Sequence, residues 1–481
     1  MGSNEKILPP LPITAEDAAF RLPPPSYEEI MGVYQTSVKE NIDDSPPPSL
    51  AYIDIMPRCL NPGNIAGKCP PQFDDFSAIV EGANRWLIDN PLFSVWKCES
   101  VDRKLSLARD GSLSYDLNEM LRHEATFGFT VYIKGLRLWL TRRPNPGTPQ
   151  QLGIKHIVPD KVTIELPTRG YYRRGRMIVN GNVTMLGGMH TYQTFEGLSE
   201  TMKKLNSRLA ADPLPGSILT IETDSIKAYE GLKKDLDPES TSWSEDKDKY
   251  QRNTQVIRIF YVKGQPAKEE IGYEEIVPHV IQMPTSTVPG KFEPFDNVVG
   301  SVGQWVANNQ GVRIVNIQQF DAVVHKNIFA QTMEVASDST DERLSTYSER
   351  RMATTLRIFH VKSNNIAHRA NFVSCRLFLP ARIGRRQFES MTQTMERIDA
   401  WLRVTGLPIY SVETVKFLLN ENNPHGADFS KSDYIIRATM GKYWLTGVRV
   451  YFNTPYSEPD PGLLPPVPDY SNSGSGSCTI L

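Results

Sequence analysis

The sequence predicts an α+β protein built from four tandem β-α-β-β modules, with a disordered tail at each end. Three observations predict this fold class. A helix-type apolar pattern occurs four times in the middle of the chain, two strand-type runs follow each copy, and both chain ends are rich in Pro or in Pro, Gly and Ser. Sequence of that composition buries too little apolar surface to offset the entropy of ordering it. We therefore expect disordered tails at 1–48 and 457–481.

Each predicted helix starts from a Phe and carries apolar residues at offsets 0, 3, 7, 10 and 14. This spacing places the apolar residues on one helix face. The four stretches begin at Phe73, Phe195, Phe292 and Phe388. We interpret them as helices that pack against a sheet.

Strand-type sequence surrounds each predicted helix. An alternating run that ends in Pro precedes it, at 52–57, 162–167, 280–284 and 376–380, and two more runs follow. The predicted modules are 49–143, 144–266, 267–365 and 366–456. The second contains an extra segment with Asn180-Gly181 between two apolar runs, which predicts a hairpin insertion. One helix over three strands is a small layer, so we expect neighbouring modules to share or extend their sheets.

A polar pair recurs in the two strands that follow each helix. The first strand ends in Glu or Gln and the second contains Arg, and the two strands are expected to be neighbours. The pairs are Glu99/Arg137, Glu222/Arg258 and Glu413/Arg449, with Gln318/Arg357 as the variant. Because the pattern occurs in all four modules, we interpret the pairs as structural cross-strand ion pairs rather than as active sites.

Composition excludes several function classes. The chain has 481 residues and a formal net charge of −2, so a strongly basic nucleic-acid-binding protein is not expected. Its five Cys show no CxxC spacing and its eight His no metal-ligand spacing, and no catalytic motif occurs. We predict a non-enzymatic protein without a metal or cofactor. No run is long and apolar enough to span a membrane.

The last four residues form a candidate lipidation signal. Cys478-Thr479-Ile480-Leu481 resembles a CaaX box, in which the Cys thiolate is prenylated and a final Leu favours geranylgeranyl. A flexible spacer without bulky residues precedes it, as an accessible tail requires. The resemblance implies a protein held on the cytosolic face of a membrane.

The N-terminal tail carries a candidate peptide ligand. Pro24-Pro25-Ser26-Tyr27 matches PPxY, in which prolines preset a polyproline II ridge for WW domains. Such tails resemble those of adaptors that bring HECT-type ubiquitin ligases to membrane cargo, and the late motifs of viral matrix proteins. The overlapping Tyr27-Glu28-Glu29-Ile30 is similar to ligands of phosphotyrosine readers. A second copy at 273–276 precedes a predicted strand, and we interpret it as structural.

These signals predict a prenylated peripheral membrane adaptor that recruits WW-domain proteins. Two alternatives remain open. The first is a matrix-like or coat protein that self-associates into homo-oligomers on membranes. The second is an enzyme with a site between modules, which a cluster of ionisable residues in one inter-module pocket, not repeated in the others, would favour.

Overall fold

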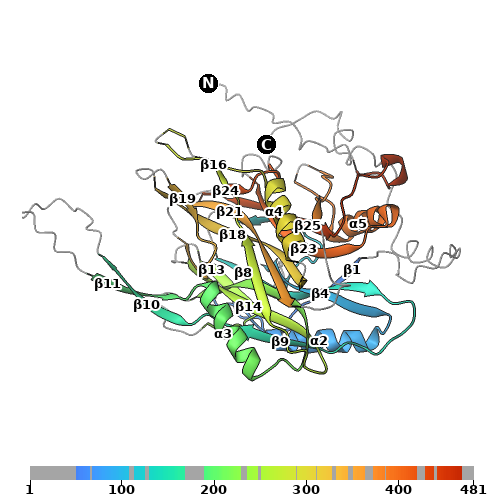
Figure 1. Cartoon of the computed structure of the whole chain (residues 1–481). Coiled ribbons are helices and arrows are strands. Elements are labelled where there is room, and N and C mark those ends of the chain that lie inside the picture. The colour runs from blue at the N-terminus through green and yellow to red at the C-terminus, as the bar shows by residue number, and fades with distance from the viewer. Residues whose placement is uncertain are drawn as a thin grey trace, which may run out of the picture.

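The computed structural model describes residues 50–468, with gaps at 66–67, 108–112, 125–128, 168–188, 229–235, 247–250, 286, 289, 310, 328–331, 345–349, 363–371, 385, 420–427 and 438–440. The described chain is mixed and strand-rich, and its four main sheets are arranged as blades in a propeller-like ring (Figure 1). Successive modules share their sheets, as expected, but the sheets form a propeller-like ring of blades rather than a clear row of tandem α+β modules.

Each blade is built on one long central strand. These strands are β8 (Phe129–Arg142), β14 (Gln251–Lys263), β21 (Arg350–Lys362) and β25 (Lys442–Phe452). One edge of each pairs, antiparallel, with an inner strand, and inner strands of neighbouring blades contact one another. The inner strands are β4 (Phe93–Lys104), β12 (Gly216–Ala228), β18 (Val312–Asn327) and β23 (Ile409–Leu419).

Two short strands share the other edge of each central strand, end to end. One comes from the same module: β1 (Ala51–Ile55), β9 (Leu152–Ile157), β15 (Ile271–Ile276) or β22 (Ser374–Phe378). The other comes from the next module: β13 (Ser242–Asp246), β20 (Asp341–Leu344), β24 (Asp433–Ile436) or, for the last blade, β7 (Leu121–Glu124) of the first module. This exchange closes the ring, and every blade contains strands of two modules.

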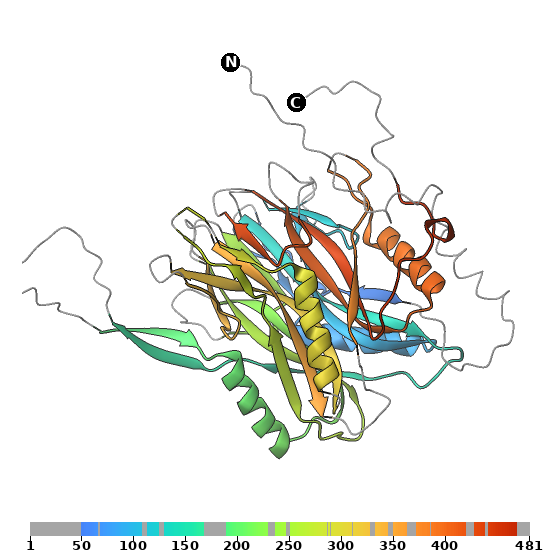
Figure 2. The same cartoon turned by 45° about the horizontal axis from the view of Figure 1, so that its top comes forward.

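The strands expected at 162–167 and 280–284 form, but outside the blades. β10 (Lys161–Pro167) pairs with β11 (Met189–Phe195) in an arm that extends from the body (Figures 1 and 2). The turn expected at Asn180-Gly181 lies outside the described residues. β16 (Val280–Gln282) pairs with β17 (Lys291–Phe292). The blade positions are taken instead by β9 and β15, whose terminal residues Leu152, Ile157 and Ile271 are buried.

The helices begin three residues after the four repeated Phe, at the second apolar position of each stripe. They are α2 (Phe76–Asp89), α3 (Leu198–Ala211), α4 (Phe295–Asn308) and α5 (Met391–Thr405). Their predicted apolar stripes are buried. The last of them, α5, begins with a capping box formed by Ser390 and Gln393.

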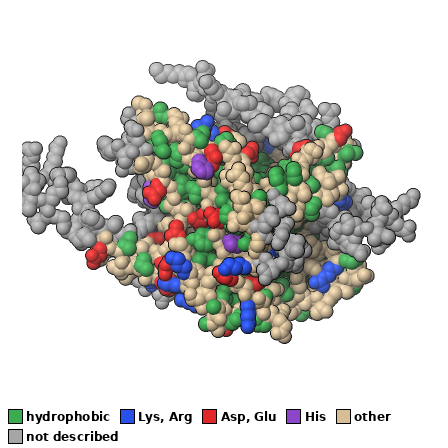
Figure 3. All heavy atoms as spheres, in the orientation of Figure 1, with side chains coloured by type: hydrophobic (Ala, Val, Ile, Leu, Met, Phe, Trp, Pro, Cys, Tyr) green, Lys and Arg blue, Asp and Glu red, His purple; other side chains and the backbone are tan. Residues whose placement is uncertain are grey.

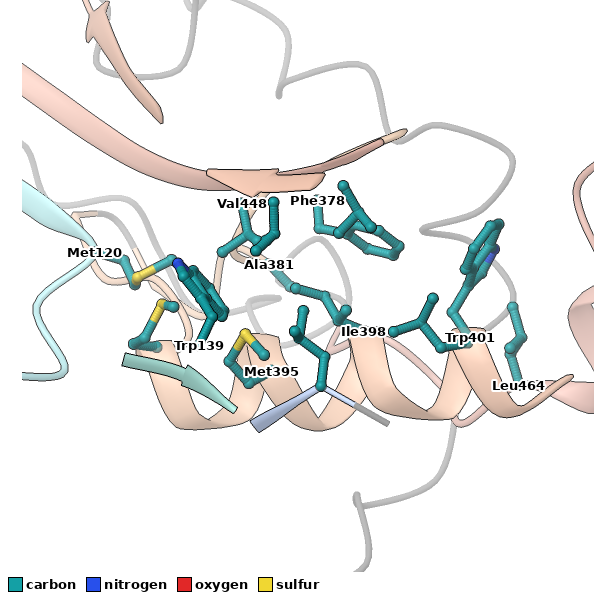
Figure 4. Packing of buried hydrophobic residues seen from close by; sticks show 14 of the residues in the cluster. Met120, Trp139, Phe378, Ala381, Met395, Ile398, Trp401, Val448 and Leu464 are labelled. Atoms are coloured by element: carbon teal, nitrogen blue, oxygen red, sulfur yellow. The ribbon is translucent and has the colours of Figure 1, made fainter. Parts of the chain in front are cut away.

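Each helix packs between its own blade and the next one. The cluster around α2 includes Leu152 and Phe260 of the second blade, and the cluster around α5 includes Trp139 of the first. Figure 4 shows Trp139 beside Met395 of α5. The four main apolar clusters therefore join neighbouring blades as well as filling them.

Several short elements complete the described chain. They are β2 (Cys59–Asn61), β3 (Gln72–Phe73), β5 (Ser106–Leu107), β6 (Leu113–Ser114), β19 (Thr332–Val335) and the 3-10 turn η4 (Pro461–Leu463). No helix in the described ranges combines the length and apolar character needed to cross a bilayer. Acidic and basic side chains alternate over the described part of the face in Figure 3.

Candidate functional site

Each repeated polar pair joins an inner strand, which carries the Glu or Gln, to the central strand of the same blade, which carries the Arg. In every blade the Glu or Gln lies directly opposite its Arg in the strand register, as the spacing predicts. All four Arg are at most 2% exposed. We call this belt of four Glu/Gln, four Arg and the residue that follows each Glu/Gln the axial ring.

In the fourth blade the predicted ion pair is direct. Arg449 Nη1 lies 3.0 Å from Glu413 Oε1. In the first blade a residue of the fourth blade stands between the two charges. The hydroxyl of Thr414 accepts a hydrogen bond from Arg137 at 2.9 Å and donates one to Glu99 at 2.9 Å.

The same bridge occurs at two more blade junctions. The hydroxyl of Ser100 accepts from Arg258 at 3.0 Å and donates to Glu222. The hydroxyl of Thr223 joins the variant pair in the same way, accepting from Arg357 at 2.8 Å and donating to Gln318 at 3.0 Å.

At the fourth junction the bridging hydroxyl is replaced by Gln319. Its side-chain carbonyl accepts from Arg449 at 2.8 Å. Without a hydroxyl between them, Arg449 and Glu413 contact each other directly. The form of each pair therefore depends on one residue of the neighbouring blade.

Backbone hydrogen bonds close the axial ring. The side chains of Glu99, Glu222, Gln318 and Glu413 accept from the backbone amides of Thr414, Ser100, Thr223 and Gln319, at 2.7, 3.0, 2.9 and 2.6 Å. Every blade thus binds the next in the same direction around the axis. A belt whose groups are engaged in this way is suited to structural support rather than to chemistry.

Three of the four arginines form ion pairs with carboxylates other than the repeated Glu. Arg137 binds Asp54 through two bonds of 2.6 and 2.7 Å. Arg258 lies 3.1 Å from Asp224, and Arg357 lies 2.5 Å from Glu275. The structure therefore differs from the direct ion pairs predicted for Glu99/Arg137 and Glu222/Arg258, because a hydroxyl of the neighbouring blade separates each pair.

Glu275 and Glu222 each have one further property that bears on their role. Glu275 belongs to the second copy of the Tyr-Glu-Glu-Ile tetrapeptide, which lies on β15, and its contact with Arg357 agrees with a structural role for that copy. Burial raises the pKa of the Glu222 carboxyl to about 7, with Asp224 adding to the shift and Arg258 opposing it.

One cavity lies where the inner strands begin. It has a volume of about 360 Å³, and all four modules line it at equivalent positions, through Trp96, Leu219, Val315 and Tyr410. Lys97 reaches it, donating to Ser411 Oγ at 3.3 Å and to the backbone carbonyl of Val412, and burial lowers its pKa. The equivalent residue of the third blade, Asn316, donates to the backbone of the second blade in the same way.

A second cavity, of about 200 Å³, lies beyond the axial ring at the other end of the inner strands. We call it the charged cavity. Its lining comes from the first, third and fourth modules. Asp102, Asp321 and Lys416 occupy equivalent positions, three residues after the repeated Glu or Gln, but differ in residue type. The ionisable side chains that line it beyond the ring are Asp102, Arg103, Glu119, Arg122, Asp321 and Lys416.

The charged cavity is a candidate site that sequence reasoning missed. Its residues belong to no motif, and ring closure alone brings them together. It is a cluster of ionisable residues between modules, and the same residue types do not recur elsewhere in the ring. Such a cluster is the observation that would favour the enzyme alternative. Among the described residues, no His, Cys, Asp and Glu side chains form a group suited to a metal ion.

Comparisons with known proteins give no relative. Neither a family model, nor a curated protein, nor a solved structure matches this chain. The remaining sequence-predicted sites are the lipidation residue Cys478 and the tail motifs at 24–27 and 27–30, and all of them lie outside the described residues.

Proposed function

We propose that this protein is a prenylated peripheral membrane scaffold, in which the four-blade ring is a rigid body that carries the two tails. Cys478 supplies the lipid anchor, and Pro24, Pro25, Ser26 and Tyr27 recruit a WW-domain protein such as a HECT-type ubiquitin ligase. The repeated polar residues of the body support this reading, since their hydrogen-bonding groups are used to hold blades together.

One observation carries the proposal: the two ends of the described chain pack in the same place. Leu50 at the N-terminal end and Leu464 and Val467 at the C-terminal end belong to the apolar cluster around α5. Figure 4 shows Leu464 beside Trp401. Both motif-bearing tails therefore start from one side of the body.

Chain geometry gives this arrangement a length scale. The segment 468–478 spans at most roughly 40 Å when fully extended, and the segment 28–49 spans at most roughly 80 Å. A prenyl group on Cys478 would hold the α5 side of the body close to the bilayer. Tyr27 could then reach a WW domain well beyond the membrane surface.

Exposed apolar side chains near this side support a second membrane contact. Leu463, next to the buried Leu464, is 65% exposed, and Val404 near the end of α5 is 38% exposed. A single lipid chain gives only marginal, reversible binding, and stable anchoring takes a second signal. Apolar side chains close to the anchor would add one.

The experiment that tests this proposal is fractionation of animal cells that express the wild type or Cys478→Ser. We expect the wild type on membranes and the variant in the soluble fraction. Cys59→Ser, which changes an exposed Cys of the body, is the matched control and should behave as the wild type. Equal distribution of the wild type and Cys478→Ser would overturn the anchor.

A further inference from the structure

Three residues that line the charged cavity each carry a buried donor without a hydrogen-bond partner among the described residues. The donors are Arg103 Nε, Arg122 Nε and Trp444 Nε1, and all three residues line this one cavity. Buried N–H groups are nearly always paired, so three orphans around one cavity point to an acceptor that the chain itself does not supply.

Strand pairing places two of these donors side by side. Arg122 of β7 lies directly opposite Trp444 of β25 in the fourth blade. On the next pair of the same sheet face, Thr446 of β25 lies opposite Lys416 of β23. The strand that the first module donates to the last blade thus adds its guanidinium to an indole and an ammonium group.

The cations of the charged cavity share their carboxylates. Asp54 binds Arg103 at 2.9 Å but also Arg137 at 2.6 Å. Asp102 lies 3.3 Å from Lys416 and 3.8 Å from Lys134. Each of these two carboxylates is therefore divided between two cations.

Apart from Asp321, the remaining acidic groups compete little for an anion. Arg122 meets Glu124 only at the long distance of 3.5 Å. Burial raises the pKa of Glu119, which favours its neutral form. Asp321 accepts from the Tyr434 hydroxyl at 2.8 Å.

From this geometry we infer that the charged cavity is a binding site for a small oxyanion of the phosphate type. Guanidinium groups present N–H donors in a planar fork that fits phosphate oxygens, and an indole N–H adds a donor that cannot accept. A volume of about 200 Å³ holds such a group together with several water molecules, each of which takes about 30 Å³. This inference is independent of both tails and of the proposed anchor.

The test is calorimetric titration of the full-length Cys478→Ser protein, which cannot be prenylated, with inorganic phosphate at constant ionic strength. We expect saturable binding with one site. Arg122→Gln should weaken it about tenfold or more, because a charge-assisted hydrogen bond and a cation are lost. Trp444→Phe keeps an aromatic ring but removes the donor, and should weaken binding about three- to tenfold.

The matched control is Arg58→Gln, which removes an Arg that lies outside the cavity and is 79% exposed. It should bind phosphate as the parent does. Thermal unfolding of each variant shows whether it is folded, and if Arg122→Gln is not, Trp444→Phe decides the question. Absence of saturable binding, or equal affinities for all variants, would overturn the site.

Vesicles distinguish two sources of the phosphate group. Phosphatidylcholine vesicles with and without phosphatidylinositol 4-phosphate are added to the same protein. Binding that requires the phosphorylated lipid and is lost in Arg122→Gln assigns the site to a lipid headgroup. Binding of inorganic phosphate without vesicle binding assigns it to a soluble phosphate.

Discussion

Glu99 and Thr414 lie 315 residues apart in the chain, yet the Glu99 carboxylate accepts hydrogen bonds from both the amide and the hydroxyl of Thr414, at 2.7 and 2.9 Å. This contact joins the first blade to the last. Equivalent backbone contacts join the other three pairs of neighbouring blades. The polar residues that repeat in the sequence are therefore the residues that connect the blades around the ring.

Removing the bridging hydroxyl of Thr414 should weaken the contact between the first and fourth blades. We expect Thr414→Val to lower the free energy of unfolding by about 2–3 kcal/mol, because Glu99 and Arg137 each lose a buried partner. Chemical denaturation measures this. Thr332→Val, an exposed position on β19, should change it by less than about 0.5 kcal/mol. Equal effects of the two substitutions would contradict the structural role of the bridge.

Stability should depend on pH through Glu222. The pKa of its carboxyl is raised to about 7 in the folded protein, above its ordinary value. The group therefore costs nothing at low pH, and its contribution becomes unfavourable as pH rises from about 4.5 to 7, because the unfolded chain releases a proton that the folded one retains. Glu222→Gln removes this dependence.

The comparison of Glu222→Gln with the wild type is best made by denaturation at several pH values. The variant's free energy of unfolding, relative to the wild type, should rise by up to about 3 kcal/mol between pH 4.5 and 7.5. The difference is needed because burial and Arg258 lower the pKa of His156 to about 4, which gives an opposite slope in a similar range. A difference that stays flat with pH would rule out the raised pKa.

The core around α5 should tolerate little loss of volume. Ile398 is fully buried there (Figure 4), so Ile398→Ala should cost about 2–5 kcal/mol of unfolding free energy. Val404→Ala, a smaller truncation at an exposed position on the same helix, should cost well under 1 kcal/mol. Similar losses for both variants would mean that α5 is not held by this cluster.

The recruitment motif can be tested without the anchor. Tyr27→Ala should abolish capture of the protein by immobilised WW domains, because the tyrosine fills the groove beside the proline ridge. Tyr34→Ala, in the same tail, should leave capture intact. Retention of Tyr27→Ala on the WW domains would remove this part of the proposed function.

Patterns along the sequence predicted the structural features that depend on residues close together in the chain. The parts of the predicted apolar stripes that lie in the four helices are buried, since a period of 3.6 residues identifies one helix face whatever lies opposite. The register of each Glu/Gln with its Arg followed from equal spacing in four modules. Two pre-helix strands were assigned to the wrong segments, because alternation alone does not show which of two candidate strands joins the blade.

The sequence patterns did not predict that strands exchanged between modules close the ring. All four exchanged strands are short, and two of them, β7 (Leu121–Glu124) and β20 (Asp341–Leu344), are polar and carry no apolar alternation. The partners of Arg137 and Arg258 depend on hydroxyl groups of another blade. In the charged cavity, Asp102, Asp321 and Lys416 each follow a repeated Glu or Gln by three residues, but Arg122 comes from the exchanged strand β7, which the spacing did not predict.

Strand exchange also has a consequence for biosynthesis. β7 lies in the first module and is synthesised early, but its partner strand β25 is the last strand of the chain to be synthesised. Until then the nascent chain carries an unpaired edge, which is prone to pairing with other chains. A chain that ended before β25 would leave β7 without its partner strand, so the first and last modules complete the fourth blade together.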